Sequence, residues 1–192
     1  MFLPSEAPGA NTFAWNHGGI QPEIANTWLG LVGPGVRRNG DDTTWVDHSD
    51  VRPTMLSLLG LEDTYPHDGR VLIDSLDASA LPQTLRAHRE TLRRLGEVYK
   101  QLNAPFGEFG SSMLLASTKA VRSGSTTDDA TYTRLEDGIS SLTTARDTLA
   151  GQIKSALDGA AFSDEALNEQ QAKGFISDAQ SLIDRAATLA SS

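Results

Sequence analysis

The chain has 192 residues, of which 39% are hydrophobic and 21% charged, a composition that suits a soluble folded protein with one domain and a second small one. Its net charge of −9 argues against a nucleic-acid-binding face, which needs clustered basic residues, and against adsorption on anionic lipid. The absence of cysteine excludes a disulfide framework and a thiol nucleophile, and no apolar run is long enough to predict a membrane span. The first residues also lack the regions of a secretory signal, which leaves the localisation open.

The character of the chain changes near residue 80. Residues 1–80 contain 11 acidic and 4 basic residues, all three tryptophans and six of the eight prolines. Residues 81–192 contain 14 acidic and 12 basic residues and are rich in helix-forming Ala, Leu, Gln and Arg. We therefore predict a first unit over 1–80 and a helical extension over 81–192.

In the first unit, short segments broken by Gly and Pro predict an α/β arrangement. The apolar run "TWLGLV" at 27–32 predicts a buried strand that stops at Gly33-Pro34-Gly35. The stretch "HSDVRPTMLSLLGL" predicts a helix capped by Ser49 or Asp50, with Pro53 in its first turn, Gly60 at its end, and an apolar face made by Met55, Leu58 and Leu59. The stretch "DGRVLIDSL" predicts a turn followed by a short strand.

In the second unit, apolar residues recur at helical spacing. They predict a helix over 85–102, a break at "NAPFG", and a shorter helix over 113–121. Two longer stripes predict helices over 131–157 and 164–190. Because these stripes match and the connection between them is short, we expect the last two helices to pack as an antiparallel hairpin.

The first candidate for chemistry is His17, in "FAWNHGGIQPEIANTWLGLVGPGV". A lone histidine is more often structural than a ligand. Here, however, Gly18 and Gly19 allow the backbone to approach a site closely, and metal ligands favour loops that an apolar strand anchors.

Three segments in this order resemble the C-terminal part of the alkaline phosphatase superfamily, and most closely its type I phosphodiesterase/nucleotide pyrophosphatase branch. The segments are "NHGGIQPEIANTWLGLVGPGV", "HSDVRPTMLSLLGL" and "HDGRVL", and the resemblance covers roughly residues 11–76. It implies that His17 is the last ligand of a two-zinc site, with Glu23 and Gly33-Pro34 in the surrounding frame. The helical remainder resembles, more weakly, an extension found in some members.

The resemblance also implies chemistry that this chain does not supply. The family uses a Thr or Ser nucleophile, an early Asp, an Asp-x-x-x-His and an Asp-His pair, and none of these motifs is present here. One histidine cannot hold a catalytic zinc, which needs three protein ligands. The first hypothesis is therefore the C-terminal portion of a metal-dependent phosphoesterase, inactive alone, whose partner is the upstream catalytic portion or a split chain. The alternative is a non-enzymatic helical interaction module that self-associates through its helices.

Other candidate residues have simpler interpretations. Asp47, His48 and Asp50 resemble a metal cluster, but a helix cap at Asp50 and a packed or exposed His48 explain them better. His67 lies in a turn by composition, and His88 lies on the apolar stripe of its helix, where a core or interface role is expected.

Overall fold

The computed structural model describes residues 26–38, 40–123 and 129–192. The chain divides into two units, 1–33 and 34–192, which we describe separately. In the first unit the described residues 26–33 form neither a helix nor a strand. The strand expected at 27–32 is therefore wrong: Trp28 and Val32 are 88% and 99% exposed, and an apolar run without a neighbouring strand cannot satisfy its backbone as a sheet does.

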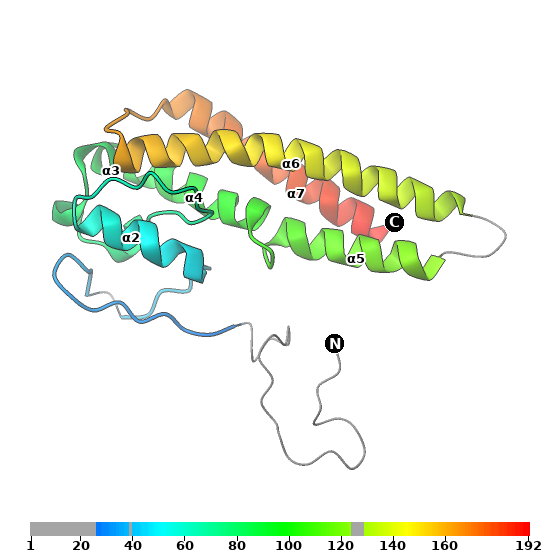
Figure 1. The fold of residues 1–192 in the computed structure, drawn as a ribbon, viewed down its shortest axis with the longest axis horizontal. Helices are drawn as coiled ribbons and strands as arrows, with labels where there is room; N and C mark the ends of the chain where they lie inside the picture. Colours follow the sequence, from blue (N-terminus) through cyan, green and yellow to red (C-terminus); the bar gives the residue numbers. More distant parts are fainter. Residues whose placement is uncertain (1–25, 39, 124–128) are drawn as a thin grey trace, which may run out of the picture. The chain divides into compact units, whose positions relative to one another are not determined.

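All longer elements of the second unit in the described residues are helices (Figure 1). In chain order the elements are η2 (His48–Asp50), α2 (Val51–Leu58), η3 (Ile73–Ser75), η4 (Ala78–Ala80), α3 (Gln83–Ala87), α4 (Arg89–Asn103), α5 (Glu108–Ser123), α6 (Ala130–Phe162) and α7 (Glu169–Ser191). The short 3₁₀ turns lie just before α2 and between α2 and α3.

The expected α/β character of residues 1–80 is wrong for the part of the chain that the structure describes, because that part contains no strand. Val36 and Leu76 form one isolated antiparallel bridge, with hydrogen bonds from Arg37 N to Ser75 O and from Asp77 N to Gly35 O. The pairing does not extend because the 3₁₀ turn η3 occupies the strand expected after Asp68. The described fold is all-helical.

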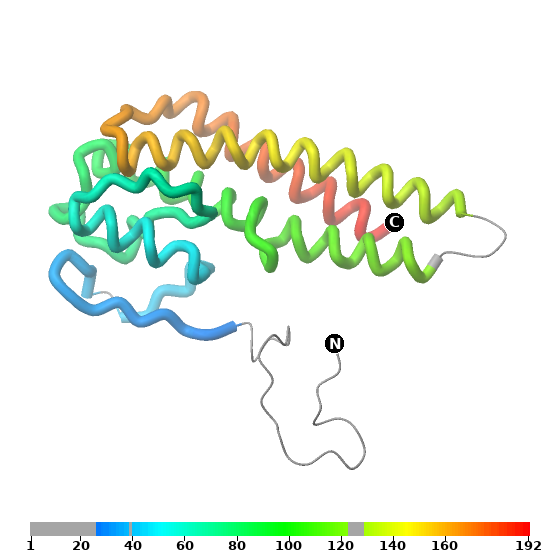
Figure 2. Tube along the Cα trace, viewed as in Figure 1, coloured from blue at the N-terminus to red at the C-terminus, as the bar shows by residue number. Residues whose placement is uncertain are grey.

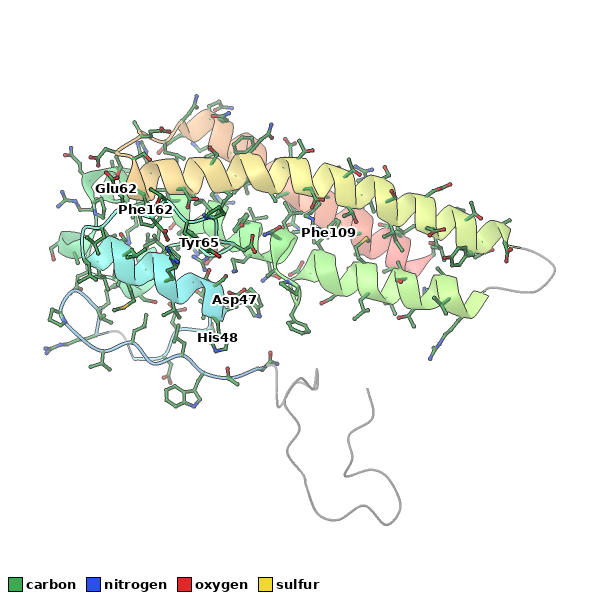
Figure 3. All side chains as sticks on the ribbon, in the orientation of Figure 1. Asp47, His48, Glu62, Tyr65, Phe109 and Phe162 are labelled. Atoms are coloured by element: carbon green, nitrogen blue, oxygen red, sulfur yellow. The ribbon has the colours of Figure 1, made fainter. Side chains whose placement is uncertain are left out.

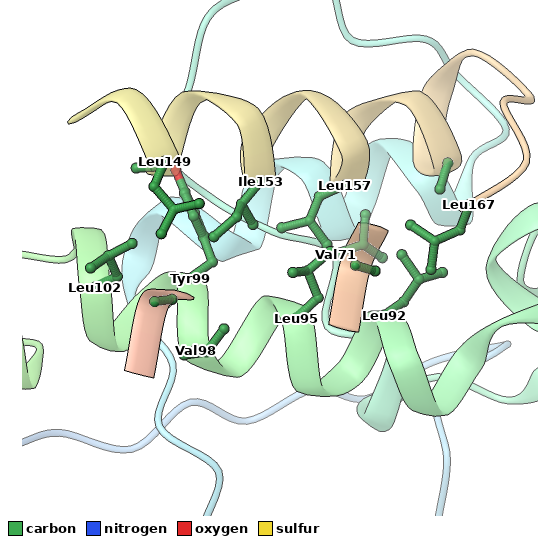
Figure 4. Close-up of a cluster of buried hydrophobic side chains, with 14 of the residues drawn as sticks. Val71, Leu92, Leu95, Val98, Tyr99, Leu102, Leu149, Ile153, Leu157 and Leu167 are labelled. Carbon is green, nitrogen blue, oxygen red and sulfur yellow. The ribbon is translucent and has the colours of Figure 1, made fainter. Parts of the chain in front are cut away.

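Helices α4 to α7 pack as an elongated bundle, which the chain trace shows clearly (Figure 2). Leucines of α4 and the buried side chains of α6 point toward one another in its core (Figure 4). Val71, Ile73 and Leu76 belong to this same core cluster, so its contacts cross residue 80. The division of the chain at residue 80 stays a prediction.

The breaks between helices follow from local chemistry. Between α4 and α5, a side chain at Gly107 would lie 2.6 Å from the carbonyl oxygens of Lys100 and Gln101, so this turn requires glycine. Before α7, the side chain of Asn168 accepts a hydrogen bond from Gln171 N and caps the helix.

The helices of the bundle lie close to where the apolar stripes predict them, but several bounds differ. The helix expected over 85–102 is divided into α3 and α4 at His88, and α5 begins at Glu108 instead of 113. Helix α6 continues to Phe162, beyond the expected end at 157, and α7 begins at Glu169 instead of 164. Helices α6 and α7 pack against each other as an antiparallel pair (Figure 1). Gly138 in the first third of α6 faces Leu189 near the end of α7, and its missing side chain leaves room for the leucine. None of the helices in the described residues is long and apolar enough to cross a membrane.

Candidate functional site

The predicted metal ligand His17, and Glu23 from the same motif, lie outside the described residues. The structure therefore does not place the part of the first segment that carries these two residues, and it describes that segment only from residue 26 onward. The second and third segments are both described, and they meet in one buried polar cluster.

Asp50 is the residue that joins these two segments. Its side chain is fully buried, and its carboxylate accepts hydrogen bonds from Arg70 N at 2.8 Å and from Asp47 N at 3.2 Å. Thr54, one turn further along α2, donates to Asp50 O at 2.6 Å and accepts from Leu72 N at 3.0 Å. The start of α2 is thereby fixed to the backbone of residues 70–72.

Lys100 of α4 supplies the positive charge beneath this junction. Its side chain is 2% exposed, and its Nζ lies 2.7 Å from Asp47 Oδ2 and 3.2 Å from Asp50 Oδ1. The same ammonium donates to Ser49 Oγ at 2.9 Å and lies 5.9 Å from the centre of the Trp45 ring. The two acidic groups are therefore compensated by one buried lysine from the bundle.

The electrostatics of the cluster favour an ionised Asp47. Burial opposes ionisation of Asp47, but hydrogen bonds from Lys100 and Ser49 outweigh it and hold the pKa of Asp47 below its usual range. In the neighbouring core, burial raises the pKa of the Tyr99 hydroxyl, so this group stays protonated at neutral pH.

Arg70 extends the cluster toward the bundle. Its side chain lies against Gly96 of α4, where an added Cβ would be 2.7 Å from Arg70 Cδ. Arg70 Nε and Nη2 have no hydrogen-bond partner among the described residues, and the side chain lines a cavity of about 10 Å³ that also touches Asp158.

Part of this cluster is recognisable in the sequence. The cap of the turn before α2 is Asp47 rather than Ser49 or Asp50, and Asp50 completes a capping box from the other side. His48 is exposed, as a structural interpretation of the Asp-His-x-Asp pattern requires (Figure 3). Lys100 was missed. The available signal was the pair Gly96 and Lys100, one turn apart, which interrupts the apolar surface of α4.

The chemistry of the cluster is structural support rather than catalysis. Across residues 26–38, 40–123 and 129–192, no three His, Asp or Glu side chains come together in a way that could hold a metal ion. The acidic groups Asp47 and Asp50 are engaged by Lys100 and by backbone amides. A general base or a metal ligand needs a free lone pair directed at a substrate site, and the oxygens of these carboxylates are already occupied by Lys100 and by hydrogen bonds within the cluster.

The outward face of α2 differs from the expected one. Met55, Leu58 and Leu59 were expected to form its buried apolar face, but Met55 and Leu59 are 47% and 65% exposed. The buried face instead carries Thr54 and Ser57. The hydrogen bonds of Thr54, to Asp50 O and from Leu72 N, hold this face of α2 against residues 70–72. The left-handed Gly60 after α2 is as predicted.

Two histidines occupy interfaces between elements. His88, expected to have a core or interface role, lies between α3 and α4 with its Nδ1 3.0 Å from Glu169 Oε1 at the start of α7. A hydrogen bond from His88 lowers the pKa of Glu169. His67 lies with its ring edge against Phe162 at the end of α6.

Comparisons of the chain with protein-family models, with curated proteins and with solved structures found no match.

Proposed function

We propose that this chain is a supporting, C-terminal portion of a metal-dependent phosphoesterase of the alkaline phosphatase superfamily, and that another polypeptide portion supplies the nucleophile and most of the metal ligands. The reaction would be hydrolysis of a phosphodiester or pyrophosphate through a covalent Thr or Ser intermediate. In the assembled enzyme, His17 would be one zinc ligand.

The observation that carries the proposal is the hydrogen bond from Arg70 N to the buried carboxylate of Asp50. It joins the second and third segments of the resemblance, which lie 20 residues apart in the chain. The Asp, Thr and Asp-Gly-Arg positions that carry the resemblance thus have one shared physical role, because each of them contributes to the same buried junction. This shared junction is what supports the proposal.

The test measures metal binding and turnover. Titration calorimetry of the full chain with zinc should give weak binding, equal to that of His17→Ala, and bis-p-nitrophenyl phosphate should not be hydrolysed above background. When the chain is co-expressed with the sequence encoded directly upstream of Met1, the pair should bind zinc and hydrolyse the same substrate, and His17→Ala should abolish turnover. Tight zinc binding or turnover by the chain alone, or a pair that stays inactive, would show the proposal to be wrong.

The second candidate function is a non-enzymatic interaction module. It is favoured by the exposed apolar side chains of α5, where Leu114, Leu115 and Val121 are all more than half exposed. Light scattering across a concentration series tests it: self-association that Leu114→Gln abolishes would support this candidate, and a monomer at all concentrations would count against self-association.

A further inference from the structure

His67 lies on the connection 61–68, which joins α2 to the segment that Asp50 holds. Its side chain is 8% exposed, and its ring meets the Phe162 ring edge-on, with 6.3 Å between the ring centres and an angle of 82°. Neither ring nitrogen has a hydrogen-bond partner among the residues that the structure describes. A buried imidazole without such partners is tolerated far better when it is neutral than when it is charged.

Four charged groups act on this ring. On the same connection, Asp63 Oδ2 lies 3.4 Å from His67 Nε2, but Arg52 of α2 already binds both oxygens of this carboxylate, at 2.8 and 3.0 Å. From α6, Lys154 and Asp158 face the ring and pair with each other. Asp63 and Asp158 could each stabilise a charged His67. Each of them is already paired with a cation, Arg52 or Lys154, and that cation would repel the charged ring.

We propose that His67 is an acid-sensitive latch, which holds the connection 61–68 against the end of α6 while its ring is neutral and releases it when the ring takes up a proton. The charged ring would have to stay buried against Phe162 beside two cations, or leave for water. Leaving is open to it, because the neighbouring residues of the connection, among them Glu62 and Tyr65, are exposed.

The direction of the pH dependence follows from the same contacts. Burial lowers the pKa of His67, Lys154 lowers it further, and Asp158 and Asp63 oppose the shift without reversing it. Because the pKa in the latched state is below the ordinary value of about 6.5, latching is fully favourable above that pH. Its contribution falls as the pH drops through about 6.5 and levels off below the lowered pKa.

Release would act on the exposed face of α2. Arg52 links this helix to the connection through Asp63, and its guanidinium also lies 4.7 Å from the centre of the Tyr65 ring. A charged His67 competes with Arg52 for Asp63, so protonation loosens the connection at both of its attachments. This inference does not depend on the proposed phosphoesterase function.

The experiment combines a histidine NMR titration of the full chain with hydrogen exchange of residues 61–68, corrected for the chemical exchange rate at each pH. The His67 ring should titrate below about pH 6.5, and protection of 61–68 should be lost over the same range. His67→Phe keeps an aromatic ring against Phe162 without a titratable group, so its 61–68 protection should no longer fall with pH. His48→Gln, at an exposed position, should behave as the unmodified chain does.

A third variant separates a latch from a merely structural histidine. Lys154→Gln removes one repelling charge and frees Asp158, so the His67 titration and the loss of protection should both move to higher pH. The measurement on Lys154→Gln tests the proposal even if His67→Phe does not fold. The proposal is overturned if His67 titrates at or above the ordinary value, if protection is lost equally in His67→Phe, or if Lys154→Gln leaves the midpoint unchanged.

Discussion

Lys100 Nζ on α4 lies 3.2 Å from Asp50 Oδ1 at the start of α2, with both side chains almost completely buried. The contact connects the bundle to the segment that carries the resemblance. It also fixes the balance of charge, because Asp50 has no other cation within ion-pair distance among the described residues, while its two backbone hydrogen bonds keep it in place.

Removing the cation of this pair should therefore be costly. Lys100→Met keeps the length of the side chain but leaves Asp50 buried and uncompensated, and we expect a loss of about 3–5 kcal/mol in the free energy of unfolding. The control is Lys173→Met on α7, where an exposed lysine lies 3.6 Å from Glu169 and should contribute less than about 0.5 kcal/mol. Urea unfolding measures both, and equal effects would refute the importance of the buried pair.

Glycine-to-alanine changes in two helices should have opposite effects on the free energy of unfolding. An alanine at Gly96 would place its Cβ 2.7 Å from Arg70 Cδ, and displacing this buried side chain should destabilise the protein by about 1–3 kcal/mol despite the better helix propensity. At Gly151 in α6 nothing lies within 4 Å of the added atom, so Gly151→Ala should stabilise by about 0.5–1 kcal/mol. If Gly96→Ala also stabilises the protein, the position of Arg70 does not depend on its close approach to Gly96.

The helical half of the chain could be predicted because the spacing of its apolar residues and the positions of its helix-breaking residues agree. Leu135, Leu142 and Leu149 repeat at heptad spacing and all are buried, as are Ala172, Ala179, Leu182 and Ala186 of the α7 stripe. The spacing of apolar residues therefore predicted which face of each helix is buried.

The first half could not be predicted in the same way, since long-range hydrogen bonds decide it. An apolar run such as 27–32 fits a strand by composition, yet a strand needs a partner, and none forms in the described residues. The orientation of α2 was missed for a related reason: hydrogen bonds made by Asp50 and Thr54 to residues 70–72 outweigh the burial of Met55 and Leu59. Such pairings are not visible in the spacing of residues along the chain.

The contribution of residues before 80 to the bundle can be measured directly. Leu76 is fully buried in the core cluster, so Leu76→Ala should cost about 2–5 kcal/mol and lower the helical melting temperature followed by circular dichroism. Asp77→Ala, at the adjacent exposed position, should have little effect. If Leu76→Ala leaves the melting temperature of the helices unchanged, this would favour the independent unit over 81–192 that the sequence predicts.

The Asp47–Lys100 pair predicts the course of acid unfolding. Because the pKa of Asp47 is lower in the folded chain than its ordinary value of about 3.9, the pair contributes stability above that pH and loses it as the pH falls through the folded pKa. Asp47→Asn should therefore be less stable than the unmodified chain at pH 6, and the difference should shrink below about pH 4. Urea unfolding at a series of pH values measures this, and a difference that stays constant down to about pH 2.5 would contradict it.

The pairing of α6 with α7 gives the last prediction. Leu182 is 7% exposed and belongs to the core, whereas the neighbouring Ser181 faces solvent. Leu182→Ala should cost about 2–5 kcal/mol, because it removes buried methyl groups and leaves a cavity that the two helices cannot close. In a chain of this size that loss corresponds to a fall of roughly 4–20 °C in melting temperature. Ser181→Ala removes no core contact and should leave the melting temperature nearly unchanged or slightly raised by the better helix propensity of alanine. Thermal unfolding of the two variants side by side decides the point: a comparable fall for both would mean that the register of α7 on α6 differs from the one in which Leu189 packs on Gly138.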